Sequence, residues 1–142
     1  MESVLTAKKT IARVVSGPEF RLAEAMLDAG GFKSLLNSPQ PLTFFAPSDD
    51  AFNRLPAETF DMLFDPIDNE LLVDLLKYNV VPGVFSMERL KELTKLHTLG
   101  GNTVHVTNKY RKILIDEGLI ISGDIACSNG IIHIVNSVIF PK

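Results

Sequence analysis

The spacing of hydrophobic residues changes near residue 95 and divides the chain into two parts. Before this point apolar residues recur every three or four positions, which is typical of amphipathic helices. The clearest stripes are Phe20, Ala23 and Leu27 in a first helix, and Leu71, Leu72, Leu75 and Leu76 in a later one. After this point apolar and polar residues alternate, which indicates strands. We therefore expect a single α+β domain spanning residues 1–142.

Local start and stop signals delimit the predicted helices. Ser16 and Glu19 have the spacing of a capping box in front of the first helix, and the glycine pair at 30–31 supplies its stop. Residues 42–46 predict a strand, followed by a helix that Ser48 caps. Further short helices are expected within residues 31–37, 57–64, 68–80 and 86–93, with Asp65 or Asp68 capping the third and Ser86 the last.

The strand-rich part predicts consecutive hairpins. Turn residues at 100–102, 116–118 and 129–130 each separate two alternating segments. Asn129-Gly130 is the strongest of these turn signals, because both residues tolerate positive φ angles. A last strand is expected over residues 137–140. The hairpin at 129–130 matters most, because it determines which residues around His133 share a face.

The register of this hairpin decides whether His133 can join a catalytic pair. A two-residue turn at 129–130 would pair Cys127 with Ile132, so Cys127 and His133 would lie on opposite faces. A cysteine–histidine nucleophile pair is therefore not expected. His133 shares its face with Asp124, and a hydrogen bond between the two is possible. We expect His133 to be a buried, hydrogen-bonded structural residue, with an acid or base role as the alternative.

Other polar residues have simpler interpretations than catalysis. Asp49 and Asp50 are adjacent acids, but neighbouring helix residues point about 100° apart, so a charged first helical turn is the simpler view. The basic stretch 108–112 contains a tyrosine that could stack on a base, yet a charged loop tip between two strands explains it as well. His97 and His105 lack metal-ligand spacing. Without phosphate-loop, lipase or zinc-protease motifs, we expect no enzyme activity, cofactor or metal.

Composition and charge exclude several classes of protein. The 142 residues carry a formal net charge of −3, with 46% hydrophobic and 22% charged residues. This suits a globular domain and argues against nucleic acid as the main partner. The single cysteine excludes an internal disulfide, and no apolar run approaches the roughly 18 residues of a transmembrane helix, so no membrane insertion is expected. The first ten residues lack signal-peptide features, which leaves a cytosolic protein or one whose targeting segment was removed.

Three segments in order carry a family resemblance: "TFFAPSDDAF" at 43–52, "LLKYNVVPG" at 75–83 and "SNGIIHIVNSVIFP" at 128–141. With them the chain resembles the fasciclin-like domain, called FAS1, over about residues 10–141. The resemblance implies an α+β fold in which a wedge of two β-sheets, with about seven strands, is packed with α-helices. The shortness of the chain and its few cysteines look more like a bacterial single-domain member than an animal multi-domain one.

The resemblance also implies a function and candidate site residues. Family members are mostly extracellular, cell-surface or periplasmic modules for adhesion and matrix interaction, and are not typically enzymes. One adhesion motif of animal members has an Asp-Ile pair before the last signature segment, and Asp124 and Ile125 occupy that place. A second motif has a Tyr-His pair, of which Tyr78 is present while Asn79 stands at the histidine position.

The sequence is therefore consistent with two functions. The first is a monomeric adhesion module whose partner is a cell-surface or matrix protein or polysaccharide. The second is a protein that binds a small ligand or cofactor in a pocket between helices and sheet, lined by the mixed face around His133 and Tyr78. A cavity at those two residues would favour the second function.

Overall fold

The computed structural model describes residues 8–141. Residues 1–7 and 142, which include most of the segment compared with signal peptides and both ends of the predicted domain, lie outside the described residues. The described helices are α2 (Ile11–Val15), the 3-10 turn η1 (Pro18–Phe20), α3 (Arg21–Gly30), α4 (Lys33–Leu36), α5 (Asp49–Asn53), α6 (Ala57–Leu63), α7 (Glu70–Asn79) and α8 (Met87–Leu90). The described strands are β1 (Leu42–Pro47), β2 (Val80–Pro82), β3 (Lys95–His97), β4 (Thr103–Lys109), β5 (Lys112–Ile115), β6 (Gly118–Cys127) and β7 (Gly130–Val135).

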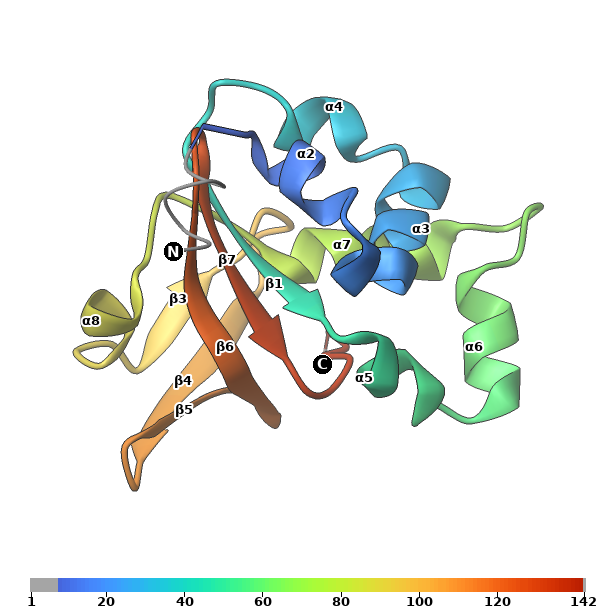
Figure 1. Cartoon of the computed structure of the whole chain (residues 1–142). Coiled ribbons are helices and arrows are strands. Elements are labelled where there is room, and N and C mark those ends of the chain that lie inside the picture. Colours follow the sequence, from blue (N-terminus) through green and yellow to red (C-terminus); the bar gives the residue numbers. More distant parts are fainter. Residues whose placement is uncertain (1–7, 142) are drawn as a thin grey trace.

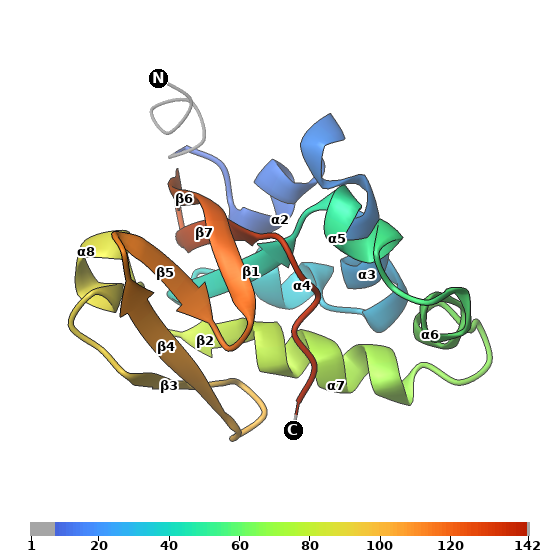
Figure 2. The ribbon, with the colours of Figure 1, turned by 90° about the horizontal axis from the view of Figure 1, so that it is seen from below.

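Seven strands follow the spatial order β2-β1-β7-β6-β5-β4-β3. Strands β1 and β7 are parallel, and the other neighbours are antiparallel. Strand β6 belongs to both halves of the sheet, and the irregular pairing between Ile120 and Ile125 allows it to bend. Strands β3 to β5 consequently fold back toward one face of β1 and β7, with α8 on the same side, while helices α2, α3, α5 and α7 cover the other face (Figures 1 and 2). The predicted α+β fold, a wedge of about seven strands packed with helices, is confirmed.

Two hydrophobic cores lie on the two faces of β1 and β7. The neighbours Phe44 and Phe45 of β1 are both fully buried, one in each core. Phe44 and Ile132 pack with residues of α2, α3, α5 and α7 in the first core. Phe45 and Val135 pack with residues of β4 and β5 in the second. Burial on both faces explains why these strands appear in the sequence as apolar runs rather than as an alternation.

The capping of the first long helix differs from the prediction. The capping box of Ser16 and Glu19 is wrong, because the 3-10 turn η1 intervenes and α3 begins only at Arg21. The Ser16 hydroxyl instead donates to a carbonyl of α2. The Asp49 carboxylate of α5 accepts a hydrogen bond of 2.9 Å from the Leu22 N–H, so this helix start is satisfied by a residue distant in sequence.

The other predicted caps largely agree with the structure. The hydroxyls of Ser48 and Ser86 accept hydrogen bonds from the backbone at the starts of α5 and α8. Gly31 ends α3 with a φ of 73°, in the left-handed region where glycine is favoured. Helix α7 differs: its N-cap residue is Asn69, whose side chain makes no capping hydrogen bond, and Asp68, one residue earlier, accepts from the Glu70 N–H.

The last hairpin has a different register from the one predicted. Cys127 pairs with Gly130 and Ile125 with Ile132, so the two-residue turn is 128–129 and the predicted turn at 129–130 is wrong. The pairing differs by two positions, which leaves each residue on its predicted face. Cys127 and His133 therefore still lie on opposite faces of the hairpin.

Tertiary contacts of Asn129 and Gly130 account for this register. The buried Asn129 side chain accepts from the Ile11 N–H at 2.9 Å and donates to the carbonyls of Leu36 and Ser38 at 2.8 and 2.7 Å. Gly130 lies against β1, where an added Cβ would be only 1.8 Å from the Leu42 carbonyl oxygen. These two residues therefore join the hairpin to α2, α4 and β1. The turn signal in the sequence contains no information on these distant contacts.

Two further predictions at strand level are wrong. Residues 137–140 form no strand, because the chain leaves the sheet after Asn136 and the Ile139 carbonyl accepts from the Asn79 side chain at 3.2 Å instead. Strand β2 (Val80–Pro82), which pairs with β1, is absent from the prediction, and the helix expected over residues 68–80 ends at Asn79. The hairpins around 100–102 and 116–118 are confirmed.

Candidate functional site

The first and last signature segments lie side by side in the fold. Strands β1 and β7 pair in parallel, with Phe45 opposite His133 and their rings stacked at 5.7 Å between centroids. The Ser48 N–H donates to the Val135 carbonyl, which extends the contact beyond the strands. Because strands β1 and β7 are packed on both faces, the parts of the two segments that form these strands lie at the centre of the fold.

His133 is 0% exposed, and both of its ring nitrogens have partners. Nε2 lies 2.6 Å from the Phe85 carbonyl oxygen, and Nδ1 lies 3.1 Å from the Asp124 N–H. A carbonyl can only accept and an N–H can only donate, so Nε2 carries the proton and the ring is neutral. Burial lowers the pKa of His133, which keeps it so. The prediction of a buried, hydrogen-bonded structural histidine is confirmed.

Cys127 has the environment of a structural thiol. It packs against the first core, on the face opposite His133. Burial raises the pKa of the Cys127 thiol to about 12. A thiol that stays protonated at neutral pH is a poor nucleophile.

Asp124 and Ile125 lie at the bend of β6. Asp124 is exposed, with a φ of 58°, and its Oδ1 accepts from the Met87 N–H at 2.8 Å at the start of α8. The hydrogen bond that joins Asp124 to His133 comes from the backbone and not from the carboxylate. Ile125 is half-buried against the first core. Asp124 therefore presents a fixed carboxylate beside α8.

Tyr78 and Asn79 are buried at the end of α7. The Tyr78 hydroxyl donates to Asp116 Oδ2 at 2.6 Å, and burial, followed by this hydrogen bond, raises the pKa of Tyr78. The Asn79 side chain donates to the carbonyls of Leu75 and Ile139. The structure therefore does not bring these two residues onto one exposed surface with Asp124. The role of the four residues in adhesion stays a prediction.

The hairpin tip, residues 109–112, lies within the basic stretch 108–112 that the sequence predicted to be a charged loop tip, while Asn108 itself pairs with Ile113 in β4. Tyr110 is 84% exposed, and the Lys109 ammonium lies 5.4 Å from its ring centroid. Tyr110 and Arg111 both have positive φ angles, 53° and 64°. The sequence shows the charge of this tip, but not the exposure of Tyr110, because an aromatic residue between two strands is as readily part of a core.

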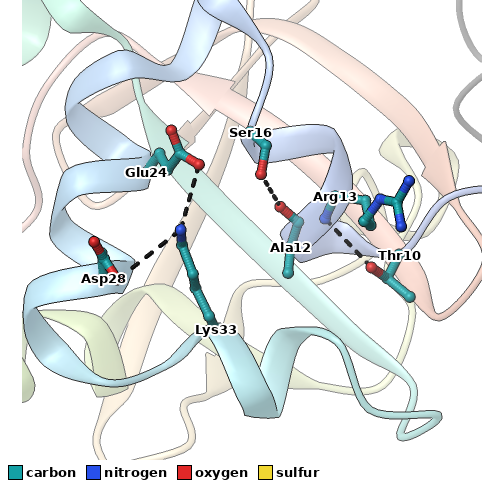
Figure 3. Close-up of polar contacts among 7 residues, drawn as sticks. All are labelled: Thr10, Ala12, Arg13, Ser16, Glu24, Asp28 and Lys33. Atoms are coloured by element: carbon teal, nitrogen blue, oxygen red, sulfur yellow. Dashed lines mark hydrogen bonds and ion pairs between the residues drawn. The ribbon is translucent and has the colours of Figure 1, made fainter.

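Three surface hollows, of about 250 to 370 Å³, provide other concave surfaces. They lie between α2 and α4, beside β2 and β3, and at the start of α7, and none of the three is lined by His133 or Tyr78. In the first, Lys33 is turned toward the carboxylates of Glu24 and Asp28, at 3.4 and 3.9 Å (Figure 3). None of these three hollows is the ligand pocket expected around His133 and Tyr78, whose side chains are buried and hydrogen-bonded.

Across residues 8–141, potential ligand side chains do not gather in groups of three that could hold a metal ion. Within the same residues, none of the helices has the length and apolar character required to cross a bilayer.

Comparison with known proteins places this geometry in a family. The model of the Fasciclin domain matches residues 18–141. The chain is 35% identical over 133 residues to Protein sll1483 of Synechocystis, which covers 93% of this chain and 73% of that protein. It is 32% identical over 123 residues to Transforming growth factor-beta-induced protein ig-h3 of Sus scrofa, covering 86% of this chain and 18% of that much longer protein.

A solved structure shares the fold as well. The FAS1 domain pair from the insect cell adhesion molecule Fasciclin I matches with a TM-score of 0.82 at 19% identity, covering 93% of this chain and 51% of that one. This agreement covers the arrangement of strands and helices. Together with the match over residues 18–141, it shows that the chain belongs to the Fasciclin domain family.

Proposed function

We propose that this chain is a non-catalytic attachment module that holds a cell-surface or matrix protein or polysaccharide, outside the cell or in the periplasm. The observation that carries the proposal is membership of the Fasciclin domain family, whose fold is shared with a cell adhesion molecule. The chain acts as a monomer through exposed loops and strand faces. The internal role of His133 and Tyr78 supports this proposal, because it removes the most obvious candidates for acid–base chemistry.

The alternative of a small-ligand or cofactor protein has less support. Its expected lining, His133 and Tyr78, is engaged in hydrogen bonds to Phe85, Asp124 and Asp116. A ligand there would have to replace these bonds, and leaving a buried donor or acceptor unpaired costs about 1–3 kcal/mol each. Attachment through the surface has no such cost.

Cell retention tests the proposed attachment. Cells of the source organism that carry or lack the chain are allowed to settle on their natural substratum, with the purified soluble chain as competitor. Cells that carry the chain should attach in larger numbers, and the folded competitor should release them. The heat-unfolded chain at the same concentration is the control. Equal attachment of both cell types, with no effect of the competitor, would overturn the proposal.

A further inference from the structure

The hairpin tip at residues 109–112 has a turn that its own sequence disfavours. Lys109 and Lys112 are the last cross-strand pair of β4 and β5, so Tyr110 and Arg111 form a two-residue turn with both φ angles positive. Such turns strongly prefer Asn-Gly, and the left-handed conformation costs other residues roughly 1–2 kcal/mol each. Strain of this kind is tolerated where the side chains themselves have a use.

The charges at the tip are also arranged against local stability. Lys109 and Lys112 stand directly opposite each other, and like charges in that position are destabilising. The ion pairs formed by lysines elsewhere in the described residues are at Lys33 and Lys91, away from this hairpin. Three of the 14 basic residues of an acidic chain therefore gather within four positions, around an exposed aromatic ring.

We propose that the hairpin tip binds an acidic polysaccharide, with its three cations on carboxylate or sulfate groups and Tyr110 stacked on a sugar ring. This inference rests on the proposed attachment function and names the class of partner. The Arg111 guanidinium can hold a carboxylate or sulfate through two parallel hydrogen bonds. Lys109 lies near the Tyr110 ring, and the high exposure of that ring leaves apolar surface available to the apolar face of a sugar.

The size and shape of the tip favour a chain polymer over a folded protein. A specific protein interface buries about 800 Å² on each partner, more than four residues at the end of a two-stranded ribbon can cover. In Figures 1 and 2 the hairpin projects from the body at the end opposite α6. A repetitive polyanion needs only small local contacts, and many copies of the chain on one surface multiply their strength.

Charge density favours a polysaccharide over nucleic acid. Duplex DNA carries one charge for about every 1.7 Å of its axis, and a body with a net charge of −3 is repelled by it. Polysaccharides of uronic acids carry no more than one carboxylate on each sugar ring, so the acidic body meets less repulsion from them while the tip retains its contacts.

Binding of the purified chain to immobilised polymers tests the inference. The probes are polygalacturonate for carboxylate, dextran sulfate for sulfate, uncharged dextran as control and oligothymidylate for nucleic acid. The wild-type chain should bind one or both acidic polysaccharides, more weakly as salt rises, and should not bind dextran. Equal binding to dextran, or tighter binding to oligothymidylate than to either polysaccharide, would overturn the proposal.

Variants separate binding from stability. The pair Tyr110→Asn and Arg111→Gly supplies the preferred turn residues, so it should raise the melting temperature while weakening binding about tenfold or more. The pair Lys109→Gln and Lys112→Gln should weaken binding and leave the fold intact. The matched control, Arg21→Gln with Lys77→Gln, removes the same charge from exposed positions on α3 and α7 and should bind within about twofold of wild type.

The two proposals fail in different ways. If the turn variant binds acidic polysaccharide as well as wild type, or the control pair loses as much binding as the tip pair, the tip is not the site. If the chain retains cells and the turn variant retains them equally, attachment stands and the tip is again overturned. If the tip binds polysaccharide but the chain retains no cells, the tip assignment stands and the attachment function falls.

Discussion

Strand β7 and the β4–β5 hairpin both carry titratable or aromatic side chains, but these side chains are buried on β7 and exposed at the hairpin tip. On β7, His133 is fully buried and both ring nitrogens are hydrogen-bonded. At the hairpin tip, Tyr110 is 84% exposed on a turn that its residues disfavour. Buried polar groups must be paired to avoid a large free-energy cost, whereas exposed ones are free to meet a partner. The segment that identifies the family is therefore not the one best placed to bind.

A substitution that disturbs the close approach of β1 and β7 is expected to lower the free energy of unfolding most. Gly130→Ala would place a Cβ 1.8 Å from the Leu42 carbonyl oxygen, so the parallel strands must separate. We expect a loss of at least about 4 kcal/mol in the free energy of unfolding, measured in urea, or failure to fold. Gly31→Ala is the control: it meets no atom within 4 Å and has only its φ of 73° to oppose it, so it should lose about 1 kcal/mol. Equal losses would mean that strand separation is not the cause.

Removal of the buried imidazole should come next. His133→Ala leaves a cavity, an unpaired Asp124 N–H and an unpaired Phe85 carbonyl. The expected loss in the free energy of unfolding is about 3–4 kcal/mol. His105→Ala changes the same residue type at an exposed position of β4 and should stay within about 0.5 kcal/mol of wild type. Similar losses in both variants would show that burial of His133 does not account for its contribution to stability.

The buried Tyr78 and the exposed Tyr110 allow the same comparison, with a smaller expected difference in the free energy of unfolding. Tyr78→Phe removes the 2.6 Å hydrogen bond to Asp116 and should cost about 2 kcal/mol, because the acceptor is charged. Tyr110→Phe, at the hairpin tip, should change the free energy of unfolding by less than about 0.5 kcal/mol. Urea unfolding of the two variants in parallel measures the difference. A neutral Tyr78→Phe would show that Asp116 is satisfied without the phenol.

The pH dependence should give the smallest effect over any single pH unit. The pKa of His133 is lowered in the folded chain, mainly by burial, so below about pH 6.5 the unfolded chain binds a proton that the folded chain does not. The free energy of unfolding should therefore fall from pH 7 to 5, by at most about 1.4 kcal/mol for each pH unit. Urea unfolding at pH 7.5, 6 and 5 measures the slope, and His133→Asn should flatten it. An unchanged slope in that variant would assign the loss to other groups.

The helix starts show why some local predictions succeed and others fail. Ser48 and Ser86 cap their helices as predicted, because the donor and acceptor are three residues apart in the chain. The predicted cap of α3 fails because its partner, Asp49, comes from another helix 27 residues away from Leu22. A capping box is a local signal, and it competes with acceptors that only folding brings near.

The candidate site was predictable to a similar extent. The burial of His133 follows from its place in an apolar run. Cys127 lies on the opposite face, as predicted, because the predicted register of β6 against β7 was wrong by two positions and a shift of two keeps every residue on its face. The adhesion residues inferred from the resemblance are divided by the structure, with Asp124 exposed and Tyr78 and Asn79 buried. Sequence periodicity could not make this division, because a residue at the end of a helix is buried only if another element covers it.

The sequence by itself determined the family, the α+β class, most helices and two of the three predicted hairpin turns, because periodicity and turn chemistry depend on residues close together in the chain. The tertiary structure decided the register of β6 against β7, since Asn129 bonds to residues 93 and 118 positions away. It also decided which polar residues stay in solvent. His133 on β7 is buried while Tyr110 at residues 109–112 is exposed on a strained turn. Burial depends on which elements pack against each other and not on the residue type alone.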